Sequence, residues 1–158
     1  MRKILLILFL FFLSYKNAYG LITVDITRGN LDPLPIAVSP LHVDPKSEKF
    51  PLFETNKLGN EISKIVEKNF KSTGLFNPLK KDAFVQKPDI AHLKPRFEDW
   101  RLIKAQALVT GKLLVQDGKL KVEFRLWDLT ASKEMTALAF TTTPTNWRRV
   151  AHIISDKI

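Results

Sequence analysis

The sequence predicts a single α/β domain in which a mixed β-sheet of about five strands is covered by two to three helices. Three observations support this fold class. Residues 107–129 alternate in hydropathy on both sides of an Asp-Gly pair, which is typical of a β-hairpin. Residues 58–70 carry apolar side chains at helical spacing. The chain has 158 residues, of which 45% are hydrophobic and 26% charged, so it can bury a core of its own.

The first twenty residues are typical of a secretory signal peptide. Arg2 and Lys3 precede an apolar run from Ile4 to Leu13, and Ala18 and Gly20 supply the small residues of a cleavage site. A membrane anchor is the alternative, but a run of about ten residues falls short of the roughly twenty that a spanning helix needs. We therefore expect residues 1–20 to direct export and to be cleaved after Gly20, without stable membrane insertion.

The net charge and the lack of cysteine indicate which classes of partner the exported chain can bind. Cleavage would remove Arg2, Lys3 and Lys16 and no acid, so the formal net charge would fall from +9 to +6. A basic exported protein is a poor candidate for nucleic-acid binding and a better one for acidic protein surfaces or the anionic envelope. The chain has no cysteine, which excludes disulfides and thiolate metal sites.

The start of the mature chain is predicted to be an extended arm, residues 21–33. Apolar residues alternate with polar ones in this arm: Ile22, Val24 and Ile26 with Thr23, Asp25 and Thr27. Residues 28–35 contain Gly29 and two prolines and are predicted to form a joint. The alternative is a plain edge strand of the domain's own sheet.

The domain itself is predicted to span residues 34–158 and to begin with a strand at Pro35–Pro40. A polar loop leads to an amphipathic helix from Leu58 to Phe70, for which Gly74 is a suitable terminator. Gly59 within this helix costs about 1 kcal/mol relative to alanine. A close approach of the helix to the sheet would explain why a glycine is present at this position.

Further along the chain, we expect an extended piece at Leu75–Leu79, a polar loop at Lys80–Arg96 and a short helix at Glu98–Ala105 before the hairpin. After the hairpin we expect a strand at Met135–Thr143. A last helix at Trp147–Ile158 follows, and we expect Thr145 or Asn146 to cap it.

The hairpin is predicted in full register. A type I′ turn at Asp117 and Gly118 places Gln116 opposite Lys119 and fixes every earlier pair. The apolar pairs on one face are Val115–Leu120, Leu113–Val122, Gly111–Phe124 and Val109–Leu126. The polar pairs on the other are Lys112–Glu123 and Thr110–Arg125. We therefore expect one buried and one exposed face.

No pattern indicates catalysis. His42, His92 and His152 are isolated in the sequence without metal-ligand spacing, and we interpret them as surface or structural residues. No nucleophile motif or Gly-rich phosphate loop occurs. The aromatic residues fit core positions and the basic residues are scattered, which also disfavours nucleic-acid binding. We expect no enzyme activity, no cofactor and no metal.

Several segments together resemble a known family. They are P-I-A-V-S-P at Pro35–Pro40, S-T-G-L-F-N-P-L at Ser72–Leu79, A-L-V-T-G-K-L at Ala107–Leu113, R-L-W-D at Arg125–Asp128 and A-H-I-I-S-D at Ala151–Asp156. In this order, behind an export leader, they resemble the amino-terminal domain family of TolB, the periplasmic component of the Tol–Pal system of Gram-negative bacteria. The second and the last segments are the most specific.

The resemblance implies a periplasmic adaptor that supports outer-membrane integrity and cell division. It implies that the arm binds the C-terminal domain of TolA, with Leu21, Ile22, Thr23, Val24, Asp25, Ile26, Thr27, Arg28 and Gly29 as contact residues. Ile22, Val24 and Ile26 would be the anchors. The family's β-propeller, which binds Pal, does not occur before Ile158, so we expect Pal binding to be affected. The alternative is a generic envelope module that contacts a lipoprotein or peptidoglycan through its basic surface.

Overall fold

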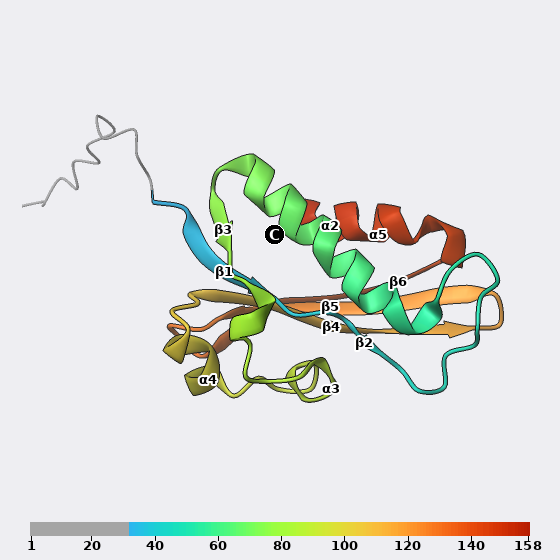
Figure 1. Cartoon of the computed structure of the whole chain (residues 1–158), viewed down its shortest axis with the longest axis horizontal. Coiled ribbons are helices and arrows are strands. Elements are labelled where there is room, and N and C mark those ends of the chain that lie inside the picture. Colours follow the sequence, from blue (N-terminus) through green and yellow to red (C-terminus); the bar gives the residue numbers. More distant parts are fainter. Residues whose placement is uncertain (1–31) are drawn as a thin grey trace, which may run out of the picture. The chain divides into compact units, whose positions relative to one another are not determined.

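The computed structural model describes residues 32–158, which belong to one folded unit. The predicted class is confirmed: in these residues six strands form one mixed sheet, accompanied by four helices (Figure 1). The strands are β1 (Leu34–Val38), β2 (His42–Val43), β3 (Phe76–Pro78), β4 (Ala107–Gln116), β5 (Lys119–Asp128) and β6 (Lys133–Thr142). The helices are α2 (Leu58–Thr73), α3 (Pro88–Ala91), α4 (Phe97–Leu102) and α5 (Trp147–Asp156).

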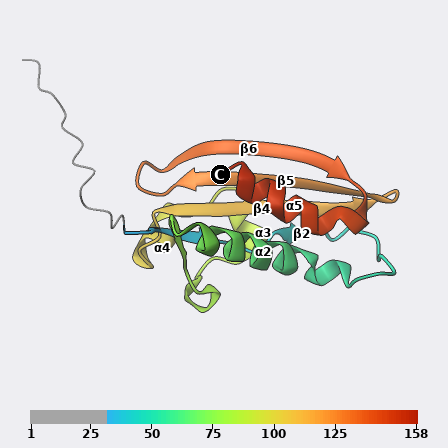
Figure 2. The same cartoon turned by 90° about the horizontal axis from the view of Figure 1, so that it is seen from above.

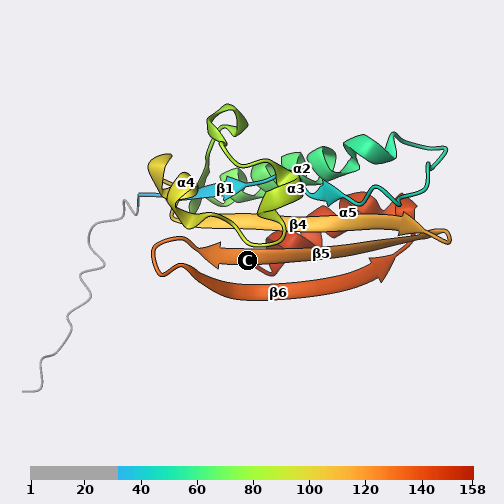
Figure 3. The ribbon, with the colours of Figure 1, turned by 90° about the horizontal axis from the view of Figure 1, so that it is seen from below.

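The sheet has the order β3-β1-β4-β5-β6, and β2 also pairs with β4. β1 is parallel to β3 and β4, and β2 is parallel to β4, whereas β4, β5 and β6 form an antiparallel meander. Helices α2 and α5 lie side by side on one face of the sheet, and α3 and α4 lie on the other (Figures 1 and 3). Within residues 32–158, every helix is too short or too polar to cross a membrane.

The predicted hairpin is confirmed in all its pairs. Asp117 and Gly118 have φ values of 51° and 66°, as a type I′ turn requires, and the observed register runs from Gln116–Lys119 to Ala107–Asp128. Lys112 and Glu123 form the expected cross-strand ion pair, with 3.4 Å between Nζ and Oε1. Both side chains remain about two-fifths exposed, so this pair contributes little to stability.

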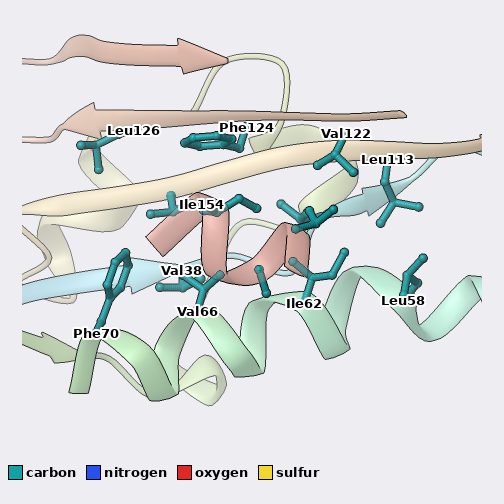
Figure 4. Packing of buried hydrophobic residues seen from close by; sticks show 14 of the residues in the cluster. Val38, Leu58, Ile62, Val66, Phe70, Leu113, Val122, Phe124, Leu126 and Ile154 are labelled. Atoms are coloured by element: carbon teal, nitrogen blue, oxygen red, sulfur yellow. The ribbon is translucent and has the colours of Figure 1, made fainter. Parts of the chain in front are cut away.

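The main hydrophobic core lies between the sheet and the α2–α5 layer (Figure 4). The apolar stripe of α2, including Ile62 and Phe70, packs toward Phe124 on β5, and α5 closes the core with Ile154. Each of these four side chains is at most 1% exposed. Gly74, with a φ of 73°, ends α2 as predicted.

Two glycines allow the chain after β1 to pass between α2 and the sheet. A Cβ atom on Gly59 would lie 1.9 Å from the carbonyl oxygen of Leu41, and the Leu41 N–H donates to the Gly59 carbonyl over 3.2 Å. A Cβ on Gly111 of β4 would lie 2.8 Å from Cδ2 of the same leucine. Gly59 therefore does allow a close approach, but to Leu41 in the connection between β1 and β2 and not to a strand of the sheet, as we had expected.

The expectation that one face of the hairpin is exposed is wrong at one end. There, Leu108 and Trp127 form a second hydrophobic cluster with Trp100 of α4. Thr110, predicted to face solvent, is fully buried and accepts a hydrogen bond of 2.9 Å from Nε1–H of Trp127. The expected exposure holds only near the turn, where Lys121 is exposed.

Short elements account for the other differences from the sequence prediction. The loop after Pro40 contains β2, and the expected loop Lys80–Arg96 contains a 3₁₀ turn and α3. Another 3₁₀ turn precedes α5, and neither Thr145 nor Asn146 caps that helix with its side chain. Periodicity cannot reveal elements of two to four residues because they complete no repeat.

Candidate functional site

The predicted partner-binding residues, Leu21–Gly29, lie outside the described residues, as does the leader. The described domain offers a different candidate, a pocket of about 820 Å³ beside β2. This volume is within the range of ligand pockets, about 300–1,000 Å³. Its lining comes from four stretches: Pro40–Pro45, the loop residues Ser47, Lys49, Phe50 and Phe53–Asn56, Asn60 of α2, and Lys87–Asp89 at the start of α3.

A network of loop hydrogen bonds forms one wall of the pocket. The Thr55 hydroxyl donates to the Glu48 carbonyl and accepts from the Phe50 N–H, each over 3.1 Å. The Glu48 N–H in turn donates to the carbonyl of Val115 on β4 over 2.8 Å. Phe50 and Phe53 pack with 5.0 Å between ring centroids and 32° between ring planes. The wall is therefore anchored to the sheet through Glu48, and it carries these two aromatic side chains.

A pair of stacked histidines lies next to this pocket. The rings of His42 on β2 and His92 after α3 are 4.4 Å apart and nearly parallel, at 4°. Nδ1 of His92 lies 3.0 Å from the Pro88 carbonyl oxygen, which fits a ring protonated at Nδ1. Burial lowers the pKa of His42 below its usual 6.5, and the neighbouring His92 lowers it further. The stack therefore joins α3 to β2 best when His42 is neutral.

The stacked rings have no hydroxyl partner among the described residues. Within residues 32–158, no hydrogen bond joins the ring of His42 or of His92 to a hydroxyl group. The described part of the chain also contains no group of three or more His, Asp or Glu side chains suited to a metal ion. The lining of the pocket combines apolar residues such as Val43 and Phe53 with polar ones such as Asn60, a combination typical of ligand pockets.

Many basic side chains of the domain already form ion pairs, hydrogen bonds or contacts with an aromatic ring. Ion pairs within residues 32–158 involve Lys57, Lys64, Lys81, Arg96, Arg101, Lys112 and Arg125. Lys81 also donates to Asn60 and Ser63, at 3.0 and 2.8 Å, and so fastens the segment before α3 to α2. Arg148 lies over the Trp147 ring, 4.4 Å from its centroid. These contacts give several basic residues a structural role.

Sequence reasoning missed the pocket and the histidine stack for the same reason. Their residues come from segments up to 50 positions apart, such as His42 and His92, and no short motif joins them. The sequence signal for the pocket is the concentration of prolines and phenylalanines between residues 40 and 53, and this pattern alone predicts no more than a loop.

Comparison with known proteins shows to which protein family the chain is similar. The model of the TolB amino-terminal domain matches residues 22–135. The Tol-Pal system protein TolB of Pelagibacter ubique (strain HTCC1062) is 64% identical over 151 residues, which cover 94% of this chain and 34% of that protein. The chain thus spans about a third of the length of this relative.

Solved structures agree on the fold. A crystal structure of TolB from Acinetobacter baumannii superposes with a TM-score of 0.61 and 18% identity over 80% of this chain and 27% of that one. The lipoprotein GNA1162 from Neisseria meningitidis gives a TM-score of 0.53 and 12% identity over 79% of this chain and 96% of that one. At such identities the likeness concerns the fold alone.

Proposed function

The chain belongs to the TolB amino-terminal domain family, and from this membership we propose that it is a periplasmic adaptor of the Tol-Pal system that binds TolA through residues 21–29. The observation that carries the proposal is the 64% identity to a Tol-Pal system protein across 94% of this chain. Through this contact the protein would support outer-membrane integrity and cell division.

The organisation of the chain is part of the proposal. Residues 1–20 are the export leader, residues 21–33 are the binding arm, and residues 34–158 are the body that carries the arm. The leader supports a periplasmic location, because it has the basic start, apolar run and small-residue exit of an export signal. The proposal does not extend to Pal, whose contact belongs to the family's propeller.

Binding by strand addition explains the composition of the arm. An extended segment that joins the sheet edge of a partner gains main-chain hydrogen bonds, and its alternate side chains enter pockets of the partner. Ile22, Val24 and Ile26 form such an alternating set. Burying each of them contributes about 1.5–3 kcal/mol, so the three anchors together supply much of a micromolar affinity of about 8 kcal/mol.

The test compares two variants of the mature full chain in binding to the C-terminal domain of TolA. Replacing Ile22, Val24 and Ile26 by serine removes the anchors, and we expect the affinity to fall at least about 100-fold, since about 2.7 kcal/mol corresponds to that factor. The matched control replaces three exposed apolar residues outside the arm, Leu52, Val85 and Leu93, by serine, and its affinity should stay within about threefold of the parent. Titration calorimetry measures both, and circular dichroism verifies the fold.

Salt distinguishes the proposal from an envelope module that binds through its basic surface. Arm binding should persist at high salt, whereas contacts between exposed charges weaken there. A chain lacking residues 21–32 that still binds the TolA domain with unchanged affinity would disprove the arm proposal. Binding that survives this deletion but disappears at high salt would favour the basic surface.

A further inference from the structure

One wall of the pocket beside β2 belongs to a short loop that contains α3. This α3 loop consists of residues 87–94, and its first three residues, Lys87–Asp89, line the pocket. α3 itself lies against β2 and β4 (Figures 1 and 2). The position of the α3 loop therefore determines whether the pocket is closed on this side.

The two ends of the α3 loop are joined by one buried side chain. Oε1 of Gln86 accepts a hydrogen bond of 3.0 Å from the Arg96 N–H and one of 2.9 Å from Nε1–H of Trp100. Gln86 is only 3% exposed and Trp100 only 1%. An amide oxygen, a main-chain N–H and an indole N–H do not ionise, so the base of the loop does not respond to pH. A compact surface loop whose ends are held close together in this way is an Ω-loop.

The residues between these ends are held by little burial. Among residues 87–94, Ala91 is buried, Pro88 and His92 are half-buried and the others are exposed. The exposed residues include two large apolar ones, Ile90 and Leu93, which are 46% and 70% exposed. Segments with few buried contacts open locally, without unfolding of the rest of the protein. The α3 loop can therefore open on its fixed base.

His92 connects the α3 loop to the sheet by two contacts. Its ring stacks on the ring of His42 on β2, which also lines the pocket. Its carbonyl oxygen accepts a hydrogen bond of 3.2 Å from Nη1–H of Arg125 on β5, and this guanidinium also pairs with Glu134. Of the two contacts, the ring stack is the one between groups that titrate near neutral pH.

We propose that the α3 loop is a pH-sensitive lid on the pocket, closed while His42 and His92 are neutral and released when both rings carry a proton. Neutral rings in parallel attract each other, whereas positive rings repel. At the observed separation of 4.4 Å, the repulsion of two unit charges corresponds to roughly a factor of five in an equilibrium constant, even in bulk water. Opening moves Lys87–Asp89 away and leaves the pocket open on that side.

The charged groups around the stack leave the direction of this response unchanged. Burial lowers the pKa of His42 and the His92 ring lowers it further, whereas Asp89 and Asp44 raise it and Lys112 lowers it. The net result is a pKa below the usual 6.5 in the closed form. In the open form the ring is exposed and binds its proton more readily. The open form therefore gains in population as the pH falls below 6.5.

Hydrogen exchange of single backbone amides, measured by NMR on the mature full chain, tests the lid. The Ala91 N–H donates to the Lys87 carbonyl over 3.0 Å and reports opening of the loop. The Val66 N–H, in the middle of α2, reports unfolding of the whole domain. Dividing the intrinsic rate of each amide by its measured rate gives a protection factor, from which the pH dependence of the exchange chemistry is removed.

Two results are expected for the parent chain. The protection factor of Ala91 should be at least about tenfold below that of Val66, because the loop opens without the rest of the fold. Between about pH 7.5 and 5.0 it should fall at least about threefold, because the open form takes up more protons. A protection factor of Ala91 equal to that of Val66, or one that does not change with pH, would overturn the proposal.

His42→Phe tests whether the stack is the latch. Phenylalanine keeps an aromatic ring against His92 but takes up no proton, and a protonated His92 over its face is attracted to it. The protection factor of Ala91 in this variant should not fall as the pH is lowered. The control is His152→Phe, the same replacement at an exposed position of α5, which should retain the response of the parent. A full pH response in His42→Phe would show that the stack does not hold the lid.

Discussion

Gly59→Ala tests whether the passage of the chain between α2 and the sheet determines the residue at this position. By helix propensity alone, alanine in α2 should stabilise the protein by about 1 kcal/mol. The structure predicts the opposite sign. The new Cβ would lie 1.9 Å from the Leu41 carbonyl oxygen and 2.8 Å from its carbon, both below the 3.0 Å that real Cβ atoms keep. The obstructing atoms belong to the backbone, so no side-chain rotation relieves the clash.

The expected loss follows from three contributions. Overpacking costs about 1–3 kcal/mol, and displacement of Leu41 breaks its N–H bond to the Gly59 carbonyl, which contributes about 1 kcal/mol. The gain in helix propensity offsets about 1 kcal/mol of this. The variant should therefore be destabilised by about 2 kcal/mol, and its melting temperature should fall by about 7 °C for a domain of this size.

Urea unfolding at 25 °C, followed by fluorescence of the buried Trp100 and Trp127, measures the free energy of unfolding. Lys68→Ala, at an exposed position of α2, is the control and should change stability by less than about 0.5 kcal/mol. If Gly59→Ala were as stable as the parent or more so, the contact with Leu41 would not be the reason for the glycine.

Two further substitutions test buried contacts by the same unfolding assay. Trp127→Phe leaves the Thr110 hydroxyl, which is fully buried, without its 2.9 Å donor, and should cost about 1–3 kcal/mol; adding Thr110→Val should recover part of the loss, and an absence of recovery would contradict the pairing. His42→Asn tests the histidine stack through pH. Because burial holds the His42 pKa below its unfolded value of 6.5, the unfolded chain binds more protons, so the parent should lose stability as pH falls below 6.5. The variant should show a flatter decline between about pH 7 and 5, and an unchanged slope would argue against the stack.

The hairpin could be predicted almost completely because its information is local. The Asp117-Gly118 turn sets the register, and alternation tells which face is buried. The helix α2 was equally accessible, because sixteen residues repeat its apolar stripe more than three times. Sequence alone could not reveal that α3 and α4 cover the far face of the hairpin. That burial depends on where the chain returns after β3. The local signs were Leu108 and Trp127, two apolar residues that are paired on the face whose other pairs are polar.

The candidate site was less predictable than the fold. The arm was visible as an alternating stretch, Ile22 to Thr27, but the role that we propose for it rests on family membership and not on its pattern. The pocket beside β2 depends on parallel pairing between His42–Val43 and β4, and a strand of two residues has no period to detect. Tertiary contact, and not propensity, creates that strand.

One end of the hairpin is buried on both faces and the other is exposed, and this difference determines where local unfolding begins. The end formed by Ala107–Val109 and Leu126–Asp128 is enclosed by hydrophobic clusters on both faces, whereas the Asp117–Gly118 turn projects into solvent. Backbone amides exchange with deuterium when a segment fluctuates out of its native pairing, and less burial makes that fluctuation easier. Deuterium should therefore enter from the turn and reach Leu108 last. The strand end farthest from its own turn would thus persist longest as the protein loosens.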